Sequence, residues 1–254
     1  MRIAACLAYD GTAFAGWQIQ NNERTVQQTI ENALEKICKQ PVPVTASGRT
    51  DSGVHALRQY MHLDFTLQMT QEQIHKALQS KLPDDIRIIE VWQPAPDFHA
   101  RFDAISRTYH FYIANQRTPF NRHYRSVFTR KTIHPERIQS LLHNFTGEHD
   151  FSAFCRPNPD LKHYRCNVSN LTFEEIEDGY RLIITANRFL HNMVRRIVGC
   201  LVEITHKNLN EALIPELLLS KSHRQKLTPT APPQGLFLYD VEYPQNKSGR
   251  DTNA

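Results

Sequence analysis

Long apolar runs and low-complexity stretches are both absent from this sequence of 254 residues. A membrane-spanning helix needs about 20 consecutive apolar residues, and disordered chains are poor in apolar residues, whereas 40% of the residues here are apolar. Residues 3–8 suggest a signal peptide, but the run is too short and Asp10-Gly11 follows it instead of a cleavage site. We therefore expect a folded cytoplasmic protein that begins with a buried strand and does not bind a membrane.

Cysteine is scarce, with five residues and no CxxC pair. The odd number argues against a disulfide framework and is typical of reduced thiols in the cytosol. Cys155, His163 and Cys166 are close in sequence, but their spacing is irregular and a fourth ligand is missing. We interpret them as packing residues and expect no metal site.

Residues 48–56, with the sequence GRTDSGVHA, are the most informative part of the chain. Gly48 and Asp51-Ser52-Gly53 are typical of a turn, and the residues that follow alternate as in a strand. Asp51 would then lie at the edge of a strand, two residues after Arg49. From the residues alone, Asp51 is a nucleophile, a general base or a cap of its own turn, and the cap is the commonest of these.

This loop resembles the catalytic loop of the tRNA pseudouridine synthase A family, in which the Asp is the essential residue. The resemblance covers the chain from residue 9 to about residue 243. Ser52 stands where the family usually has Ala, and residues 206–208 replace a turn that contains Gly, but neither change removes a side chain that the chemistry needs. The other matching segments, in family order, are residues 9–18 (YDGTAFAGWQ), 82–86 (LPDDI), 98–104 (FHARFDA), 107–109 (RTY), 147–151 (GEHDF), 188–199 (RFLHNMVRRIVG) and 231–236 (APPQGL).

The resemblance implies an RNA uridine isomerase that acts on positions 38, 39 and 40 of the tRNA anticodon stem-loop. The reaction breaks the C1′–N1 glycosidic bond, turns the base and rejoins it through C5. Nothing is oxidised, hydrolysed or transferred, so we expect neither a metal nor an organic cofactor. The family also implies a homodimer with the RNA lying across both subunits.

Four residues receive roles from this resemblance. Asp51 is the nucleophile or the base that starts bond cleavage, and the sequence leaves both possibilities open. Arg49 is the candidate to hold the flipped nucleotide out of the stack. Tyr109 is expected to pack against the target base with its hydroxyl available for proton transfer, although most strand aromatics simply face a core. The family assigns the partner of Asp51 to the Arg of the MVR triplet, which is Arg195, but the helical pattern alone does not separate it from Arg196.

The charge distribution also favours an RNA partner. The net charge is only +4, yet the window from Arg101 to Lys131 holds seven basic residues and one acid, Asp103. Seven aromatic residues are interleaved with them. Cations bind phosphates and aromatic faces stack on unpaired bases, so we expect most of these arginines to be exposed and about half of the aromatics to be buried.

Two other classes of protein compete with the isomerase. A non-catalytic RNA-binding module would share the basic aromatic surface, but it has no use for the Asp51 loop and should carry RNP-type motifs, which the sequence lacks. A metal-dependent nuclease could be built on Asp10, Asp51 and Asp103, but these acids lack ligand spacing.

The pattern of elements predicts an α+β protein. It predicts two ferredoxin-like halves that share a mostly antiparallel sheet, with helices packed on it and an active-site cleft between the halves. We place an N-terminal domain at residues 1–96 and a C-terminal domain at 97–254, because Pro94-Ala95-Pro96 is the best candidate for a boundary. The expected helices start at Thr25 and Thr70, each with a capping box, then at Pro135, near Leu190 and near Asn210. The expected strands are 2–9, a weak one at 42–46, one after the Asp51 loop, then 86–92, 107–114, 167–176, 180–187 and 236–243.

Overall fold

The computed structural model describes residues 1–223 and 225–249. Its contacts divide it into two compact units, the first made of Met1–Ser106 together with the chain from Phe237, and the second of Arg107–Leu236. The first unit therefore combines two separated stretches of sequence. A compact unit is defined by contacts and a domain by its ability to fold alone, so the division after residue 96 stays a prediction.

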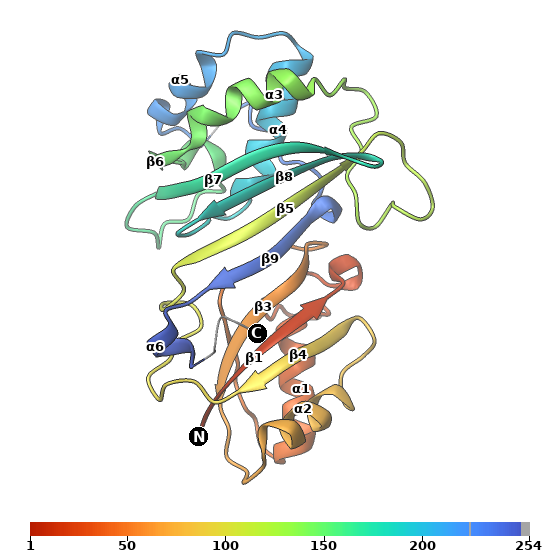
Figure 1. Ribbon diagram of the computed structural model, residues 1–254, viewed down its shortest axis with the longest axis vertical. Coiled ribbons are helices and arrows are strands. Elements are labelled where there is room, and N and C mark those ends of the chain that lie inside the picture. The colour runs from red at the N-terminus through yellow and green to blue at the C-terminus, as the bar shows by residue number, and fades with distance from the viewer. Residues whose placement is uncertain (224, 250–254) are drawn as a thin grey trace. The chain divides into compact units, whose positions relative to one another are not determined.

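The first unit is a sheet with helices on it (Figure 1). Strand β1 pairs antiparallel with β3 on one side and β4 on the other, β2 pairs with β3, and β9 joins β3 in parallel. Helices α1 and α2 contact each other, and α2 packs on β4. The order β1-α1-β2-β3-α2-β4 is the one predicted. The elements are β1 (Arg2–Tyr9), α1 (Val26–Cys38), β2 (Thr45–Ala46), β3 (His55–Asp64), α2 (Gln71–Gln79), β4 (Ile86–Trp92), β9 (Leu236–Glu242) and α6 (Gln245–Ser248).

The helix starts follow the predicted signals, with one correction. At α2, the Thr70 side chain accepts from the Gln73 backbone and the Gln73 side chain accepts from the Thr70 backbone, which is a complete capping box. At α1, Thr25 caps the helix, but the box is only half formed. The Gln28 amide donates to Asn32 at 2.9 Å, one turn along the helix, instead of returning to the cap.

The second unit contains four antiparallel strands in the order β5-β8-β7-β6 (Figure 1). Helix α3 packs on β7 and on α4. Helix α4 buries a broad apolar face that includes Met193, Ile197 and Leu201. The elements are β5 (Ser106–Ala114), α3 (Pro135–Leu141), β6 (Gly147–Asp150), β7 (Arg165–Ile176), β8 (Gly179–Ala186), α4 (Met193–His206) and α5 (Leu213–Ser220).

The predicted α+β class is confirmed, with mostly antiparallel strand pairing and helices packed on the strands. Strand β6 was not predicted, because its four residues, GEHD, have no apolar alternation, and it forms by pairing with the edge of β7. The weak strand predicted at 42–46 is reduced to the two residues of β2. Within the described residues, no helix is both long enough and apolar enough to cross a bilayer.

Candidate active site

The Asp51 loop joins β2 to β3 and is anchored through its neighbour Thr50. The Thr50 hydroxyl is 2.7 Å from the Tyr9 hydroxyl in a buried hydrogen bond, and the Thr50 carbonyl accepts from the Trp17 backbone at 3.0 Å. Burial raises the pKa of Tyr9 to about 12, so its hydroxyl stays protonated at neutral pH. Two contacts therefore fix Thr50, the residue that immediately precedes Asp51. Asp51 is half-buried.

The downstream side of the loop is held by backbone bonds. The Asp51 carbonyl accepts from Val54 N at 3.1 Å, which closes the turn. Gly53 has a φ of 73° and donates its N–H to the Phe14 carbonyl at 3.3 Å, and the Ser52 hydroxyl donates to the same carbonyl at 3.3 Å. The turn is thus stabilised by a hydrogen bond within it and by hydrogen bonds to the 9–18 segment.

Two glycines of that segment allow the backbones to approach each other. A Cβ on Gly11 would lie 2.1 Å from the Val54 carbonyl oxygen, and one on Gly16 would lie 2.7 Å from the Thr50 carbonyl oxygen. Gly16 also has a φ of 110°, a value that side chains disfavour. The backbone of the 9–18 segment, YDGTAFAGWQ, therefore packs directly against the backbone of the Asp51 loop.

The upstream side of the loop is tied to β3 by the buried side chain of Gln59. Its Oε1 accepts from the Ser47 hydroxyl at 2.5 Å, and its Nε2 donates to the Gly48 carbonyl at 2.9 Å. A fully buried amide is costly unless both ends are bonded. Gln59 meets that condition, because both ends of its amide are bonded. The same bonds fix Ser47 and Gly48, which lead into the loop.

His55, the first residue of β3, links the loop to the C-terminal strand. Its buried ring stacks on Phe237 of β9 with centroids 4.5 Å apart. Its Nδ1 lies 3.0 Å from Gly11 N and 3.2 Å from an Asp10 carboxylate oxygen. Asp10 itself accepts from Thr12 N at 2.9 Å, so it caps the short turn after β1. These contacts fix the end of the loop against two other segments of the first unit.

The remaining predicted site residues have the following local surroundings. Arg49 is exposed on the Asp51 loop. Tyr109, on β5 in the second unit, is buried, and its ring meets Phe189 edge to face at 4.9 Å.

The two candidate arginines on α4 have different partners. Arg195 donates from Nε to the Ala231 carbonyl at 2.7 Å and from Nη1 to Asn192 Oδ1 at 3.0 Å. Arg196 donates from Nη1 to the Cys155 carbonyl at 2.9 Å.

The basic aromatic window is partly a surface and partly core. Of its aromatics, Tyr109 and Phe111 are buried, whereas Phe102 is 75% exposed and Phe120 is 93% exposed. Four of its seven basic residues are exposed, namely Arg101, Arg117, Arg122 and Arg130. Exposed aromatics beside exposed arginines are what single-stranded RNA requires.

The acids and thiols that were considered as metal ligands have other surroundings in the structure. Among the described residues, no group of three His, Cys, Asp or Glu side chains could hold a metal ion. Asp103 is used as a cap, because its carboxylate accepts from the His99 backbone at 2.7 Å. Cys155 and Cys166 are buried, and burial raises the pKa of each thiol to about 12. Asp10 and Asp103, two of the three acids of the nuclease alternative, thus each accept a bond from a nearby backbone N–H.

Comparison with known proteins assigns the chain to a class. Residues 5–103 and 141–244 match the family described as tRNA pseudouridine synthase. The chain is therefore a pseudouridine synthase, which is an isomerase.

Individual relatives narrow the class. A tRNA pseudouridine synthase A of Shouchella clausii is 41% identical over 248 residues, which cover 96% of this chain and 94% of the relative. The enzyme of the same name from Bacillus pumilus is 36% identical, with 96% and 99% covered, and that of Staphylococcus aureus is 36% identical, with 99% and 95% covered. The chain belongs to the tRNA pseudouridine synthase A family. A crystal structure of a Cbf5-Nop10-Gar1 complex, at 11% identity and a TM-score of 0.31 over 92% of this chain and 56% of its own, is too distant to add to this.

Sequence reasoning missed the residues that support the loop. Tyr9 and His55 lie in the matching segments, but nothing in their spacing paired them with Thr50 and Phe237. Gln59 carried no signal, because a polar residue in a strand usually faces solvent. Its burial is evident only once β3 is paired with β1, where Gln59 lies opposite Leu7.

Proposed function

We propose that this isomerase converts uridines 38, 39 and 40 of the tRNA anticodon stem-loop to pseudouridine. The observation that carries the proposal is the Asp51 loop, which keeps the family's GRTD sequence and is held on both sides by the bonds described above. A carboxylate on a rigid loop is preorganised for attack or proton transfer at a fixed position. The matching segments along the whole chain support the same substrate.

In the proposed reaction, the target nucleotide leaves the stack and enters a pocket beside Asp51. The C1′–N1 bond breaks, the uracil turns, and C5 bonds to C1′. The C5 proton is lost and N1 gains a proton, so the product has the formula of the substrate. Asp51 acts in its ionised form, either as the nucleophile at C1′ or as the base that starts the cleavage.

We further propose that Arg195 pairs with the Asp51 carboxylate in the predicted cleft. A guanidinium in that place would hold the carboxylate in its ionised form and fix its orientation. Arg196 is the weaker candidate, because the family resemblance gives this role to the Arg of the MVR triplet, which is Arg195. Bonds to Ala231 and Asn192 steady the Arg195 side chain, as expected of a group that must orient a catalytic carboxylate.

Tyr109 is proposed to pack against the target base. Its edge-to-face contact with Phe189 restricts the ring, so the surface offered to a base would be rigid. Its hydroxyl would serve in the proton transfers that the change from N1 to C5 requires.

One assay tests the proposal against its competitors. The protein is incubated with unmodified tRNA and EDTA, and the RNA is then treated with carbodiimide and reverse transcribed. We expect stops at positions 38, 39 and 40. Cleaved RNA would indicate a nuclease, and bound but unchanged RNA would indicate a binding module.

Arg49→Ala should reduce pseudouridine formation by at least about a hundredfold, or ~2.7 kcal/mol of barrier. Without this guanidinium, nothing on the Asp51 loop would keep the flipped nucleotide out of the stack. The matched control is Arg87→Ala, which removes an exposed arginine from β4 of the same unit. Single-turnover rates of the two variants decide the matter, because equal rates would show that Arg49 does not hold the nucleotide.

We also propose that the enzyme is a homodimer with tRNA across both subunits. Sedimentation should then give a mass near twice 29.5 kDa. A monomer at micromolar concentration would contradict this.

A further inference from the structure

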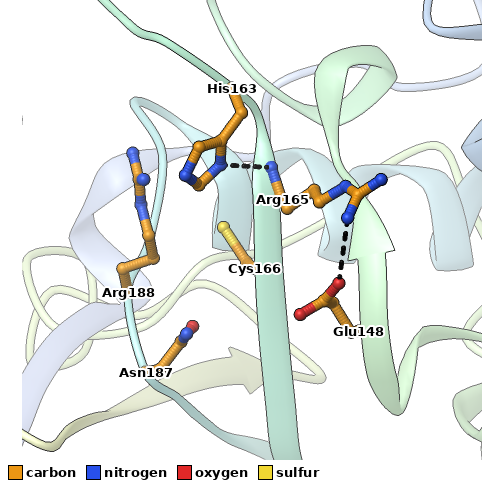
Figure 2. Close-up of a pocket in the computed structure, with 6 residues that line it drawn as sticks. All are labelled: Glu148, His163, Arg165, Cys166, Asn187 and Arg188. Carbon is orange, nitrogen blue, oxygen red and sulfur yellow. Dashed lines mark hydrogen bonds and ion pairs between the residues drawn. The ribbon is translucent and has the colours of Figure 1, made fainter.

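The second unit contains a shallow pocket of about 520 Å³ that the proposed catalytic steps do not use. It lies where β6, β7 and the segment after β8 come together (Figure 2). Two arginines and a histidine line it together with a single acid. The lining residues are Glu148, His163, Arg165, Cys166, Asn187 and Arg188.

The charged groups of the pocket leave an excess of positive charge. Arg165 and Glu148 form an ion pair of 3.5 Å, but both side chains are more than 60% exposed, so the pair is weak. Within the described part of the chain, the Arg188 guanidinium makes no ion pair and no hydrogen bond. Its charge is therefore not balanced by any described carboxylate.

The uncharged groups leave no reactive side chain at this place. Cys166 is 1% exposed, and burial raises the pKa of its thiol to about 12, although the nearby Arg188 lowers it. The thiol therefore stays protonated and lines the pocket without reacting. His163 Nδ1 accepts from Arg165 N at 3.3 Å, so in the neutral ring the proton is on Nε2, which is a donor. Arginine and histidine donors without a nucleophile suit the binding of an anion.

Residues that line the pocket, or follow them in sequence, contact β5, the strand that carries Tyr109. Two hydrogen bonds fix the position of Asn187. Its carbonyl accepts from Arg107 Nη1 at 2.8 Å, and its side chain accepts from Asn167 N at 2.9 Å. Arg107 is two residues before Tyr109 on β5, so both side chains point to the same face of the sheet. Phe189, which contacts Tyr109, directly follows Arg188. Arg188 is thus adjacent in sequence to Asn187, which lines the pocket, and to Phe189, which contacts the Tyr109 ring expected at the target base.

We infer that this pocket binds a backbone phosphate of the substrate RNA, a few nucleotides from the target uridine, through Arg188 and His163. A phosphodiester presents the oxygen acceptors that guanidinium and imidazole N–H groups recognise. The inference rests on the proposed function in that it takes the RNA to be the tRNA substrate. It goes further by assigning a phosphate site to residues outside the Asp51 loop.

Arg188→Gln tests the inference with an anticodon stem-loop RNA as the probe. The slope of log affinity against log salt should become shallower by about 0.7 to 0.9, the change expected for one lost phosphate contact. Lys36→Gln, which removes an exposed lysine from α1 in the first unit, should leave the slope unchanged. A slope equal to that of the wild type for Arg188→Gln would overturn the inference.

A second variant moves the affinity in the opposite direction. Glu148→Gln removes the acid among the described residues that line the pocket and releases Arg165, so binding at low salt should tighten by about twofold to fivefold. A misfolded protein would not bind more tightly, so this result does not depend on the stability of Arg188→Gln. Unchanged or weaker binding by a folded Glu148→Gln would contradict a phosphate site.

Neutralising the RNA one phosphate at a time identifies the ligand. Methylphosphonate linkages are introduced singly along the stem-loop, and the affinity of each RNA is measured with the wild type and with Arg188→Gln. One linkage near the target uridine should weaken binding to the wild type clearly more than binding to the variant, which keeps only the His163 contact. If every linkage affects the two proteins equally, the pocket does not bind the backbone. Failure of the proposed function is a separate result, namely a wild-type enzyme that binds this RNA but forms no pseudouridine.

Discussion

Asp51→Asn should lower the rate of pseudouridine formation by several powers of ten, each worth about 1.4 kcal/mol of barrier. The amide keeps the shape of the side chain but is neither a nucleophile nor a base. The affinity for tRNA should change little, because the loss of one negative charge does not hinder the approach of phosphates. The measurements are the steady-state rate of pseudouridine formation and the tRNA binding curve, each for the wild type and for Asp51→Asn.

A structural role for Asp51 makes the opposite forecast. A residue that only caps its turn would cost about 1 kcal/mol of stability and leave the rate almost unchanged. The bonds described for this turn through the Asp51 carbonyl, Gly53 N and Ser52 do not depend on the charge of the Asp51 side chain. A catalytic role for Asp51 therefore predicts that the melting temperature of Asp51→Asn stays close to that of the wild type. Asp160→Asn, at an exposed acid of the second unit, is the control for loss of charge.

Gly16→Ala should both destabilise the protein and slow the reaction sharply. The new Cβ would lie 2.7 Å from the Thr50 carbonyl oxygen, and the φ of 110° is unfavourable for alanine. The strain is on the order of 1–3 kcal/mol. Relief requires the backbone at Thr50 to move, and Asp51 moves with it. Since a displacement of about 1 Å can cost a hundredfold in rate, we expect at least that loss.

Gly48→Ala provides the matched control in the same loop. A Cβ on Gly48 would meet no atom within 4 Å, so this variant should keep nearly the wild-type rate and melting temperature. Thermal melting and single-turnover rates of both variants separate the effects. If Gly16→Ala were as active and as stable as Gly48→Ala, the 9–18 segment would not be the support of the Asp51 loop.

Local signals were sufficient to predict most of the elements. The capping box at Thr70 depends on residues three positions apart, and it was predicted correctly. The box at Thr25 was wrong in part, because Asn32 competes for the Gln28 amide. Strand β6 was missed because it forms by pairing with β7, a contact that leaves no alternating pattern in its own residues.

The support of the candidate site could not be predicted in the same way. The hydrogen bond between Tyr9 and Thr50 joins residues 41 positions apart, and the ring contact of His55 with Phe237 depends on the parallel pairing of β3 and β9. The helical pattern left Arg195 and Arg196 equivalent, whereas the contact of Arg196 with the Cys155 carbonyl depends on how α4 packs. Such long-range contacts follow from the whole fold, and the sequence pattern contains no local trace of them.

Single-turnover pseudouridine formation on unmodified tRNA, measured at saturating enzyme for the wild type and for Asp51→Asn, is the most direct test of the Asp51 assignment. Saturation removes differences in binding, so the rate reports the chemical steps. We expect the wild type to modify positions 38, 39 and 40 and a folded, tRNA-bound Asp51→Asn to form almost no pseudouridine. A folded variant that isomerises at near the wild-type rate would show that Asp51 is not the catalytic residue.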